Sequence, residues 1–275
     1  MLNNIKKYGL KLFDVSLRDG LQSIPRVLTI NEKKDIFHRI INKYTPDNIE
    51  VGSIVSKKVL PQFHDSIELF NHGRMINTDN MYLLIPNYKN YVKAKNTVYN
   101  IRNISLLTST SESFIKKNTK MSEAQNLANL RLILEKRRKN EIDNIKLYIS
   151  CISECPIDGK IDNDIVVEKI LSYFSFSDIN EFCLSDTCGT LSYIDYKYII
   201  DKLLSKTDPS RIGLHLHIGD NSDEIKKIIK YSINNDIKKF DVSCLDNSGG
   251  CVVTMKKDRI NSNLTYEQLD SMLEK

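Results

Sequence analysis

The chain contains no tryptophan, only six cysteines, and no two cysteines in a C-x-x-C pair. In a chain of 275 residues, this argues against both a zinc module and a disulfide scaffold, so we expect reduced thiols. The chain also lacks a run of about 18 apolar residues, the length that a membrane span requires. The N-terminal segment is too short and too polar for a signal peptide, and the C-terminus is no peroxisomal address. These absences predict a cytoplasmic protein without a membrane partner.

A strong excess of charge of either sign is also absent. The sequence has 40 Lys and Arg against 35 Asp and Glu, a net charge of +5, which is too weak to indicate a nucleic-acid partner. One basic run, Lys136–Lys139, lies between Glu135 and Glu141 in a predicted helix. Such a run is typical of a solvated helix face.

What the sequence does contain is a regular alternation of two patterns. Short apolar and β-branched runs, typical of buried strands, occur at Lys11–Ser16, Asn48–Val51, Met81–Ile85, Asn103–Thr108, Lys146–Cys151, Asn180–Leu184, Arg211–His217 and Lys238–Cys244. Segments with helical periodicity follow them at Asn31–Tyr44, Gln62–Asn71, Tyr88–Tyr99, Ser122–Arg138, Asp164–Phe174, Tyr193–Leu204, Ser222–Asn234 and Tyr266–Leu273. This alternation predicts an α/β fold, a single (β/α)8 TIM barrel over residues 1–275, with a doubly wound open sheet as the alternative.

Polar side chains follow the predicted strands at one end. Because active sites of such barrels lie at the carboxyl ends of the strands, these residues are expected to share one rim. They are Arg18, Asp19 and Gln22; Glu50 and Ser53; Asn87; Ser109, Ser111 and Glu112; Ser150 and Cys151; Asp186 and Thr187; His215 and His217; and Asn247, Ser248 and Cys251. An arginine, carboxylates and imidazoles on one rim predict a catalytic mouth.

Two histidines on one strand are the strongest local signal. In Gly213–His217 the side chains of His215 and His217 share a strand face, because side chains two residues apart point the same way. They are either two ligands of one metal ion, or one core histidine and one chance neighbour. Asp19 could complete a mixed oxygen and nitrogen set, which favours Mg2+ or Mn2+, with Zn2+ as an alternative.

Four further residues have both a catalytic and a structural interpretation. Arg18 could face charge that develops on a carbonyl oxygen, or form a structural salt bridge across the mouth. Glu50 and Asp186 could orient Arg18 and a histidine, or satisfy loop amides. Cys251 follows two glycines and is either a functional thiol or an inert one.

The same residues carry a resemblance that extends over nearly the whole chain. The motifs are Arg18–Gln22, Ile49–Ser56, Pro61-Gln62, Ile85–Asn87, Ser111–Asn118, Ser150-Cys151 with Cys155-Pro156 and Gly159-Lys160, Ser185–Thr187, His215–His217, Gly249–Cys251 and Asn263-Leu264. This set resembles 3-hydroxy-3-methylglutaryl-CoA lyase, within the wider group of metal-dependent barrel lyases and acyl-condensing synthases. The Ser111–Asn118 and Cys155–Lys160 segments are similar to the lyase branch in particular.

The resemblance implies a metal-dependent cleavage of 3-hydroxy-3-methylglutaryl-CoA to acetyl-CoA and acetoacetate. The implied ligands of the divalent ion, Mg2+ or Mn2+, are Asp19, His215, His217 and Asn263. The implied catalytic residues are Arg18, which polarises the thioester carbonyl, Cys251, an acid/base on a mobile loop, and the supporting residues Glu50 and Asp186. Gln22 and Ser150 are expected to contact the acyl-CoA substrate, and homodimer formation is left open.

The sequence departs from the family pattern in three places. Ile218 follows the second histidine, where the family usually has an acidic or amide residue. The loop Asp246–Val252 lacks the usual Gly-Leu-Gly-Gly-Cys-Pro pattern. The chain stops after the eighth predicted barrel helix, so we expect it to lack the family's usual C-terminal extension. The alternatives are a related acyl-CoA condensing enzyme or aldolase on the same scaffold, or a non-catalytic degenerate homologue.

Overall fold

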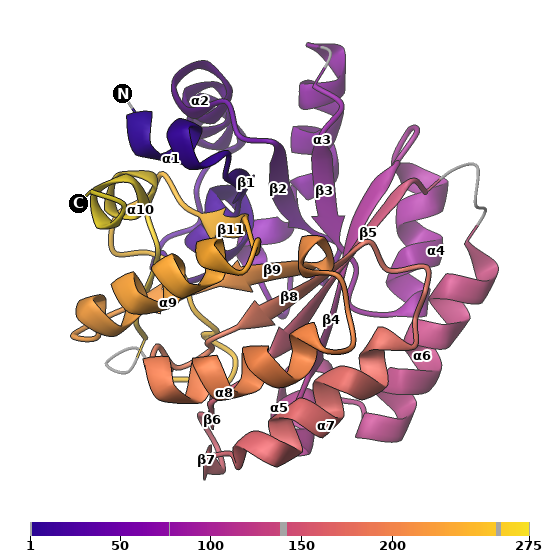
Figure 1. Ribbon diagram of the computed structural model, residues 1–275. Helices are drawn as coiled ribbons and strands as arrows, with labels where there is room; N and C mark the ends of the chain where they lie inside the picture. Colours follow the sequence, from indigo (N-terminus) through magenta and orange to yellow (C-terminus); the bar gives the residue numbers. More distant parts are fainter. Residues whose placement is uncertain (1, 77, 138–141, 257–259, 275) are drawn as a thin grey trace.

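A computed structural model describes residues 2–76, 78–137, 142–256 and 260–274 of the chain (Figure 1). Its centre is a closed barrel of eight parallel strands in the order β1-β11-β9-β8-β5-β4-β3-β2. The barrel strands are β1 (Lys11–Asp14), β2 (Asn48–Ser53), β3 (Met81–Leu84), β4 (Asn103–Ser109), β5 (Asn144–Ser150), β8 (Glu181–Ser185), β9 (Ile212–His215) and β11 (Lys239–Val242). The predicted (β/α)8 barrel is therefore confirmed, and the open sheet was the wrong alternative.

Helices surround the barrel and largely follow the predicted periodic segments (Figure 1). They are α1 (Asn3–Tyr8), α2 (Ile30–Arg39), α3 (Ser66–Met75), α4 (Tyr88–Thr97), α5 (Glu112–Thr119), α6 (Glu123–Lys136), α7 (Asn163–Phe174), α8 (Tyr193–Leu204), α9 (Ser222–Asn234) and α10 (Tyr266–Met272). None of the helices within the described ranges is long and apolar enough to cross a membrane. The short helices α1 and α5 were not predicted, because neither is long enough to show a clear periodicity.

The ends of several helices are set by local capping that the sequence encodes. Thr29 and Glu32 form a capping box at the start of α2, and Ser122 and Gln125 form another at the start of α6. The third helix begins at Ser66, four residues later than predicted, because Pro61–Phe63 forms a separate 3₁₀ turn. These corrections shift element boundaries and leave the order of elements unchanged.

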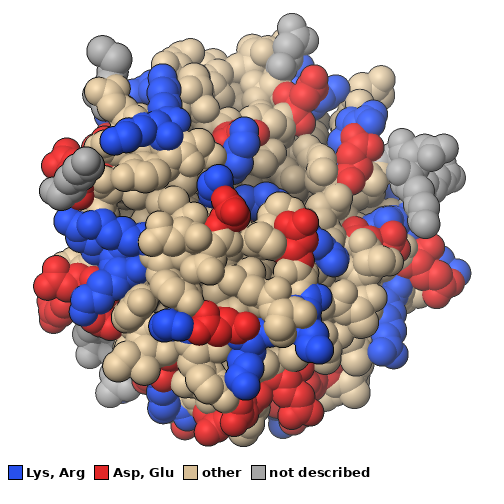
Figure 2. Space-filling model, viewed as in Figure 1, with Lys and Arg blue, Asp and Glu red and all other residues tan. Residues whose placement is uncertain are grey.

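The predicted basic helix face is only partly a helix. Helix α6 ends at Lys136, and Arg137 is extended, with its guanidinium paired to the Asp178 carboxylate at 2.7 Å. Arg138, Lys139 and Glu141 lie outside the described residues. On the face shown in Figure 2, acidic and basic side chains are interspersed.

The predicted seventh strand is in fact two strands. Strand β9 ends at His215, and His217–Ile218 (β10) pairs antiparallel with Ser262–Asn263 (β12) outside the barrel. The strand divides here because the backbone hydrogen-bond partners change. The His215 carbonyl accepts from the Asp186 amide, which follows barrel strand β8, whereas the Leu216 carbonyl accepts from the Leu264 amide, which follows β12. The chain therefore leaves the barrel between the two histidines and meets the segment before α10.

Candidate active site

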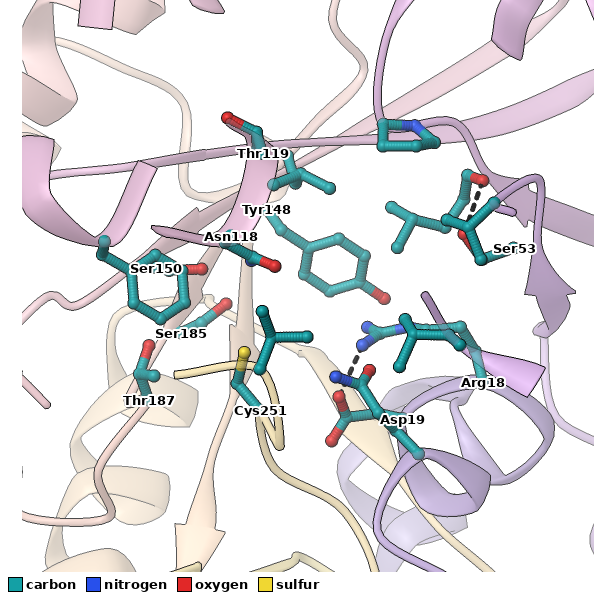
Figure 3. A pocket seen from close by; sticks show the side chains of 18 of the residues that line it. Arg18, Asp19, Ser53, Asn118, Thr119, Tyr148, Ser150, Ser185, Thr187 and Cys251 are labelled. Atoms are coloured by element: carbon teal, nitrogen blue, oxygen red, sulfur yellow. Dashed lines mark hydrogen bonds and ion pairs between the residues drawn. The ribbon is translucent and has the colours of Figure 1, made fainter. Parts of the chain in front are cut away.

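A cavity opens at the carboxyl ends of the barrel strands, as the sequence predicts. Its lining includes seven of the ten residues for which the resemblance implies a role, namely Arg18, Asp19, Gln22, Ser150, His215, His217 and Cys251, together with Ser53 and Thr187 of the predicted rim. Figure 3 shows Arg18 and Asp19 on one side of the Tyr148 ring, and Asn118 and Ser150 on the other. Much of the remaining lining is apolar, including Val55, Leu60 and Phe63. The cavity therefore joins a charged end to an apolar wall.

Three ligand-type side chains converge at the charged end. Asp19 lies in a short π-helical turn, Ser16–Gly20, that directly follows β1. Its Oδ2 atom lies 3.7 Å from Nε2 of His215 and 3.5 Å from Nε2 of His217. Burial alone would raise the pKa of Asp19, but Arg18 and the two imidazoles hold it well below its usual range. The site thus provides a buried, ionised carboxylate beside two imidazole nitrogens.

Each imidazole is oriented by a hydrogen bond from its other nitrogen. His215 donates from Nδ1 to Oδ2 of Asp241 at 3.0 Å, and His217 donates from Nδ1 to the Asp186 carbonyl at 2.7 Å. Burial alone would lower the pKa of His215, but the carboxylates of Asp19 and Asp241 outweigh it and raise that pKa to about 9. These bonds leave both Nε2 atoms facing Asp19, the arrangement that metal-binding histidines adopt.

Asn263 provides a fourth group for an ion. The β10–β12 pairing places it directly opposite His217. Its side-chain Oδ1 and Nδ2 are buried without a hydrogen-bond partner, as is Nε2 of His217. Because buried polar atoms almost always have partners, these orphaned atoms fit an absent ligand. With oxygen from Asp19 and Asn263 and nitrogen from two histidines, the donor set fits a divalent cation.

Gly249 packs closely against this fourth group. Its φ of 113° is rare for any residue with a side chain, and an added Cβ would lie 2.3 Å from Nδ2 of Asn263. We expect Gly249→Ala to displace Asn263 and to lower both thermal stability and Mn2+ affinity, measured by melting and by metal titration. The control is Gly9→Ala, where φ is also positive but no atom lies within 4 Å of the added Cβ. Equal loss of Mn2+ affinity in both variants would contradict the expectation.

Arg18 is held by three neighbours. Its Nε pairs with Oε2 of Glu50, its Nη1 lies 2.5 Å from Oδ1 of Asp19, and its guanidinium carbon lies 4.8 Å from the centre of the Tyr148 ring. Burial alone would lower the pKa of Arg18, but the charges of Glu50 and Asp19 raise it well above its ordinary value. Arg18 therefore forms a salt bridge across the mouth and also lines the cavity, so the two interpretations of this residue do not exclude each other.

Tyr148 is a site residue that the sequence analysis missed. Its hydroxyl donates to Oε2 of Glu50 at 3.1 Å and is directed toward Arg18 (Figure 3). The available signal was strand alternation, because Lys146, Tyr148 and Ser150 share one face of β5. A bulky polar aromatic on the face of Ser150 would have pointed to the mouth.

The side chain of Asp186 binds amides of the following loop, whereas its main-chain carbonyl binds His217. Its carboxylate accepts from the amides of Thr190 and Leu191, both at 3.1 Å, and burial raises its pKa. Its carbonyl is the group that orients His217. The sequence left open whether Asp186 and Glu50 orient site residues or bind loop amides. The Asp186 carboxylate fits the second interpretation, and the Glu50 carboxylate, which binds Arg18, fits the first.

Cys251 lies in the loop after β11 and is the least buried of the six free cysteines. It lines the cavity and packs against a buried cluster of Phe114, Cys151 and Cys155. Burial raises the pKa of its thiol, which keeps the proton on sulfur at neutral pH. The preceding Gly250 amide donates to Oδ2 of Asp19 at 2.7 Å. The loop thus places a protonated thiol beside the three-ligand group.

Comparisons of the sequence with known proteins identify a family and related enzymes. The family described as HMGL-like matches residues 9–222. The 3-hydroxy-3-isohexenylglutaryl-CoA/hydroxymethylglutaryl-CoA lyase of Pseudomonas aeruginosa is 28% identical over 246 residues, covering 88% of this chain and 78% of that protein. Mitochondrial hydroxymethylglutaryl-CoA lyase of Macaca fascicularis is 27% identical over 207 residues, covering 75% of this chain and 62% of the relative. The chain thus spans less than two thirds of the length of the macaque relative.

Solved structures show the same fold. An HMG-CoA lyase of Acinetobacter baumannii, in complex with coenzyme A and 3-methylmalate, superposes with a TM-score of 0.82 at 26% identity, covering 96% of this chain and 82% of that one. Hydroxymethylglutaryl-CoA lyase of Pseudomonas aeruginosa also gives 0.82 at 26% identity, covering 96% and 84%. With the family match over most of its length, the chain belongs to the HMGL-like family.

Proposed function

We propose that this protein is a divalent-metal-dependent carbon–carbon lyase that cleaves 3-hydroxy-3-methylglutaryl-CoA into acetyl-CoA and acetoacetate. The observation that carries the proposal is the convergence of Asp19, His215 and His217 beside Arg18 in one cavity. The relatives described above are lyases acting on this class of acyl-CoA, which does not favour the condensing alternative. The coenzyme A bound in the Acinetobacter structure supports an acyl-CoA substrate.

Asp19, His215, His217 and Asn263 are the proposed ligands of the ion. Bound there, a divalent ion supplies Lewis acidity that lowers the pKa of the substrate hydroxyl. The absence of thiolate from this set favours Mg2+ or Mn2+. The hydrogen bonds from the Nδ1 atoms of both histidines keep each imidazole in the tautomer that presents Nε2.

Arg18 is the proposed stabiliser of the departing enolate. When the hydroxyl loses its proton to solvent, its carbon becomes the ketone of acetoacetate, the adjacent carbon–carbon bond breaks, and the electron pair of that bond places negative charge on the thioester oxygen of acetyl-CoA. The guanidinium is fixed by Glu50 and Tyr148, so it needs no reorganisation as that charge appears. Gln22 and Ser150 line the same cavity and are proposed to contact the substrate.

Cys251 is the proposed acid that protonates the enolate carbon. Its raised pKa keeps the proton available, and a donor must reach hydrogen-bond distance of its acceptor. We propose that the Gly249–Cys251 loop closes over bound substrate to bring the thiol into reach. A cytoplasmic location is also proposed, because all six cysteines are free.

Incubation with 3-hydroxy-3-methylglutaryl-CoA tests the proposed function. We expect acetoacetate and acetyl-CoA in equal amounts, formation that stops with EDTA, and recovery on adding Mg2+ or Mn2+. Full activity after complete metal removal would overturn the metal dependence. Absence of products with metal present would overturn the proposed lyase activity. Condensation of acetyl-CoA under the same conditions would support the alternative of an acyl-CoA condensing enzyme.

Cys251→Ser is expected to lower turnover by at least about 10²-fold, because a hydroxyl is a far weaker acid than a thiol. Mn2+ affinity and melting temperature should remain at wild-type values. The matched control is Cys244→Ser, at a buried cysteine whose thiol accepts from Arg39 outside the cavity. Iodoacetamide should inactivate the wild type only slowly, because the thiolate is the reacting form and the raised pKa of Cys251 keeps it scarce at neutral pH; bound substrate should protect the enzyme. Native turnover in Cys251→Ser would show that another group delivers the proton.

A further inference from the structure

Beneath the cavity, a buried lysine crosses the inside of the barrel. Lys146 on β5 is 1% exposed, and its ammonium lies 3.5 Å from the centre of the Phe13 ring. It forms ion pairs with Asp241 on β11 and, at 3.1 Å, with Glu181 on β8. A charged lysine is almost never fully buried unless it is paired, and here both partners come from other strands.

Asp241 connects this lysine to the proposed metal site. Its Oδ1 accepts from Lys146, and its Oδ2 accepts from Nδ1 of His215 at 3.0 Å. The Cys183 thiol is a further donor to Oδ2, at 3.7 Å. Glu181, Cys183 and Asp241 lie close enough together to suggest a second cation site. The ammonium of Lys146 already occupies that position, so the group needs no metal ion.

A series of contacts connects Lys146 to Asp19 through Asp241 and His215. Lys146 fixes one oxygen of Asp241, the other oxygen fixes Nδ1 of His215, and Nε2 of His215 then lies 3.7 Å from Oδ2 of Asp19. A carboxylate can rotate about its last bond unless a second partner holds it. Without the ammonium, Asp241 would also be a buried charge with too few partners, which is costly and favours rearrangement.

We propose that Lys146 is a positioning residue for the metal centre, acting through Asp241 to hold His215 in the rotamer and tautomer that bind the ion. This inference rests on the proposed metal site. It extends the site through two further residues to the interior of the barrel. Groups that orient metal-bound histidines typically change metal affinity by about 10–100-fold when they are removed.

A purely structural role is the competing interpretation, and the chain offers a control for it. Lys33 is equally buried, at 1% exposure, and pairs with the buried carboxylate of Asp65 at 2.5 Å. That pair connects α2 to the segment before α3 and includes none of the proposed ligands. Lys33→Met therefore removes a buried ammonium of the same kind without touching His215.

The experiment measures Mn2+ binding without substrate, by the electron paramagnetic resonance signal of the free ion. Lys146→Met is expected to weaken binding by about 10–100-fold, while Lys33→Met lowers the melting temperature and leaves Mn2+ affinity unchanged. Asp241→Asn is the second variant, should Lys146→Met fail to fold. It retains the Lys146–Glu181 pair, but the amide places a donor NH2 group at one of the two positions where Asp241 has an accepting oxygen, so either Lys146 or His215 loses its acceptor. We expect about 10-fold weaker binding in Asp241→Asn.

The outcomes separate this inference from the metal site itself. If the wild type binds no Mn2+, the proposed metal site fails, and the inference fails with it. If the wild type binds Mn2+ and folded Lys146→Met or Asp241→Asn binds it equally well, the positioning role alone is overturned. Equal weakening in Lys33→Met would also overturn it, because the effect would then follow from stability.

Discussion

His217→Ala is expected to abolish acetoacetate formation and to remove most of the affinity for Mg2+ or Mn2+. The substitution deletes one of the two proposed nitrogen ligands, and it leaves the Asp186 carbonyl without its hydrogen-bond donor. Metal titration of the purified variant and the acetoacetate assay measure the two losses separately. The melting temperature without added metal is also expected to fall, because the substitution leaves a cavity and removes the donor of the buried Asp186 carbonyl. Metal affinity is therefore measured well below the melting temperature of the variant.

His72→Ala is the control for this experiment. Its imidazole lies between α2 and α3, with Nε2 3.0 Å from Nε2 of His38, far along the chain from the proposed ligands. We expect this variant to keep both activity and metal affinity. Wild-type activity in His217→Ala would exclude the histidine pair as the metal site.

Arg18→Gln is expected to lower turnover by about 10²–10³-fold with little change in the Michaelis constant. The guanidinium would act on charge that is absent from the bound substrate and develops in the transition state and the enolate, and loss of one such donor costs about this much. Steady-state kinetics at saturating metal separate the two constants. Arg102→Gln, which removes an exposed guanidinium paired with Asp143, should have wild-type kinetics.

The opposite pattern would change the assignment of Arg18. A raised Michaelis constant with unchanged turnover would make it a binding residue. Loss of folding alone would make the contacts with Asp19 and Glu50 structural. The melting temperature of Arg18→Gln, compared with that of Arg102→Gln, identifies this second case.

The sequence predicts the barrel well because its signals are local. Each strand is a short apolar run, most helices have a periodic face, and parallel strands of a barrel are buried on both faces. The same locality explains the prediction of the rim, since polar residues such as Arg18, Asp19 and Cys251 follow strands directly. Their approach to one another in a single cavity follows from barrel closure.

The features that the sequence does not predict depend on distant partners. The break after His215 requires pairing with Ser262–Asn263, and no pattern near Leu216 indicates it. The role of Asp186 toward His217 belongs to a carbonyl that every residue type possesses. Lys146 falls within a predicted strand, but only the positions of Glu181 and Asp241 on other strands reveal why a charge is buried there.

The pairing of β10 with β12 also bears on the order in which the protein matures. Asp19 is synthesised early, whereas Asn263 emerges only after every strand of the barrel has been made. The full set of proposed ligands therefore exists only once β1 has paired with β11 and β12 has paired with His217. An ion that binds this set and not the unfolded chain favours the finished state by mass action. In a cell, capture of the metal would be among the last steps of biosynthesis, and it would distinguish completed barrels from unfinished ones.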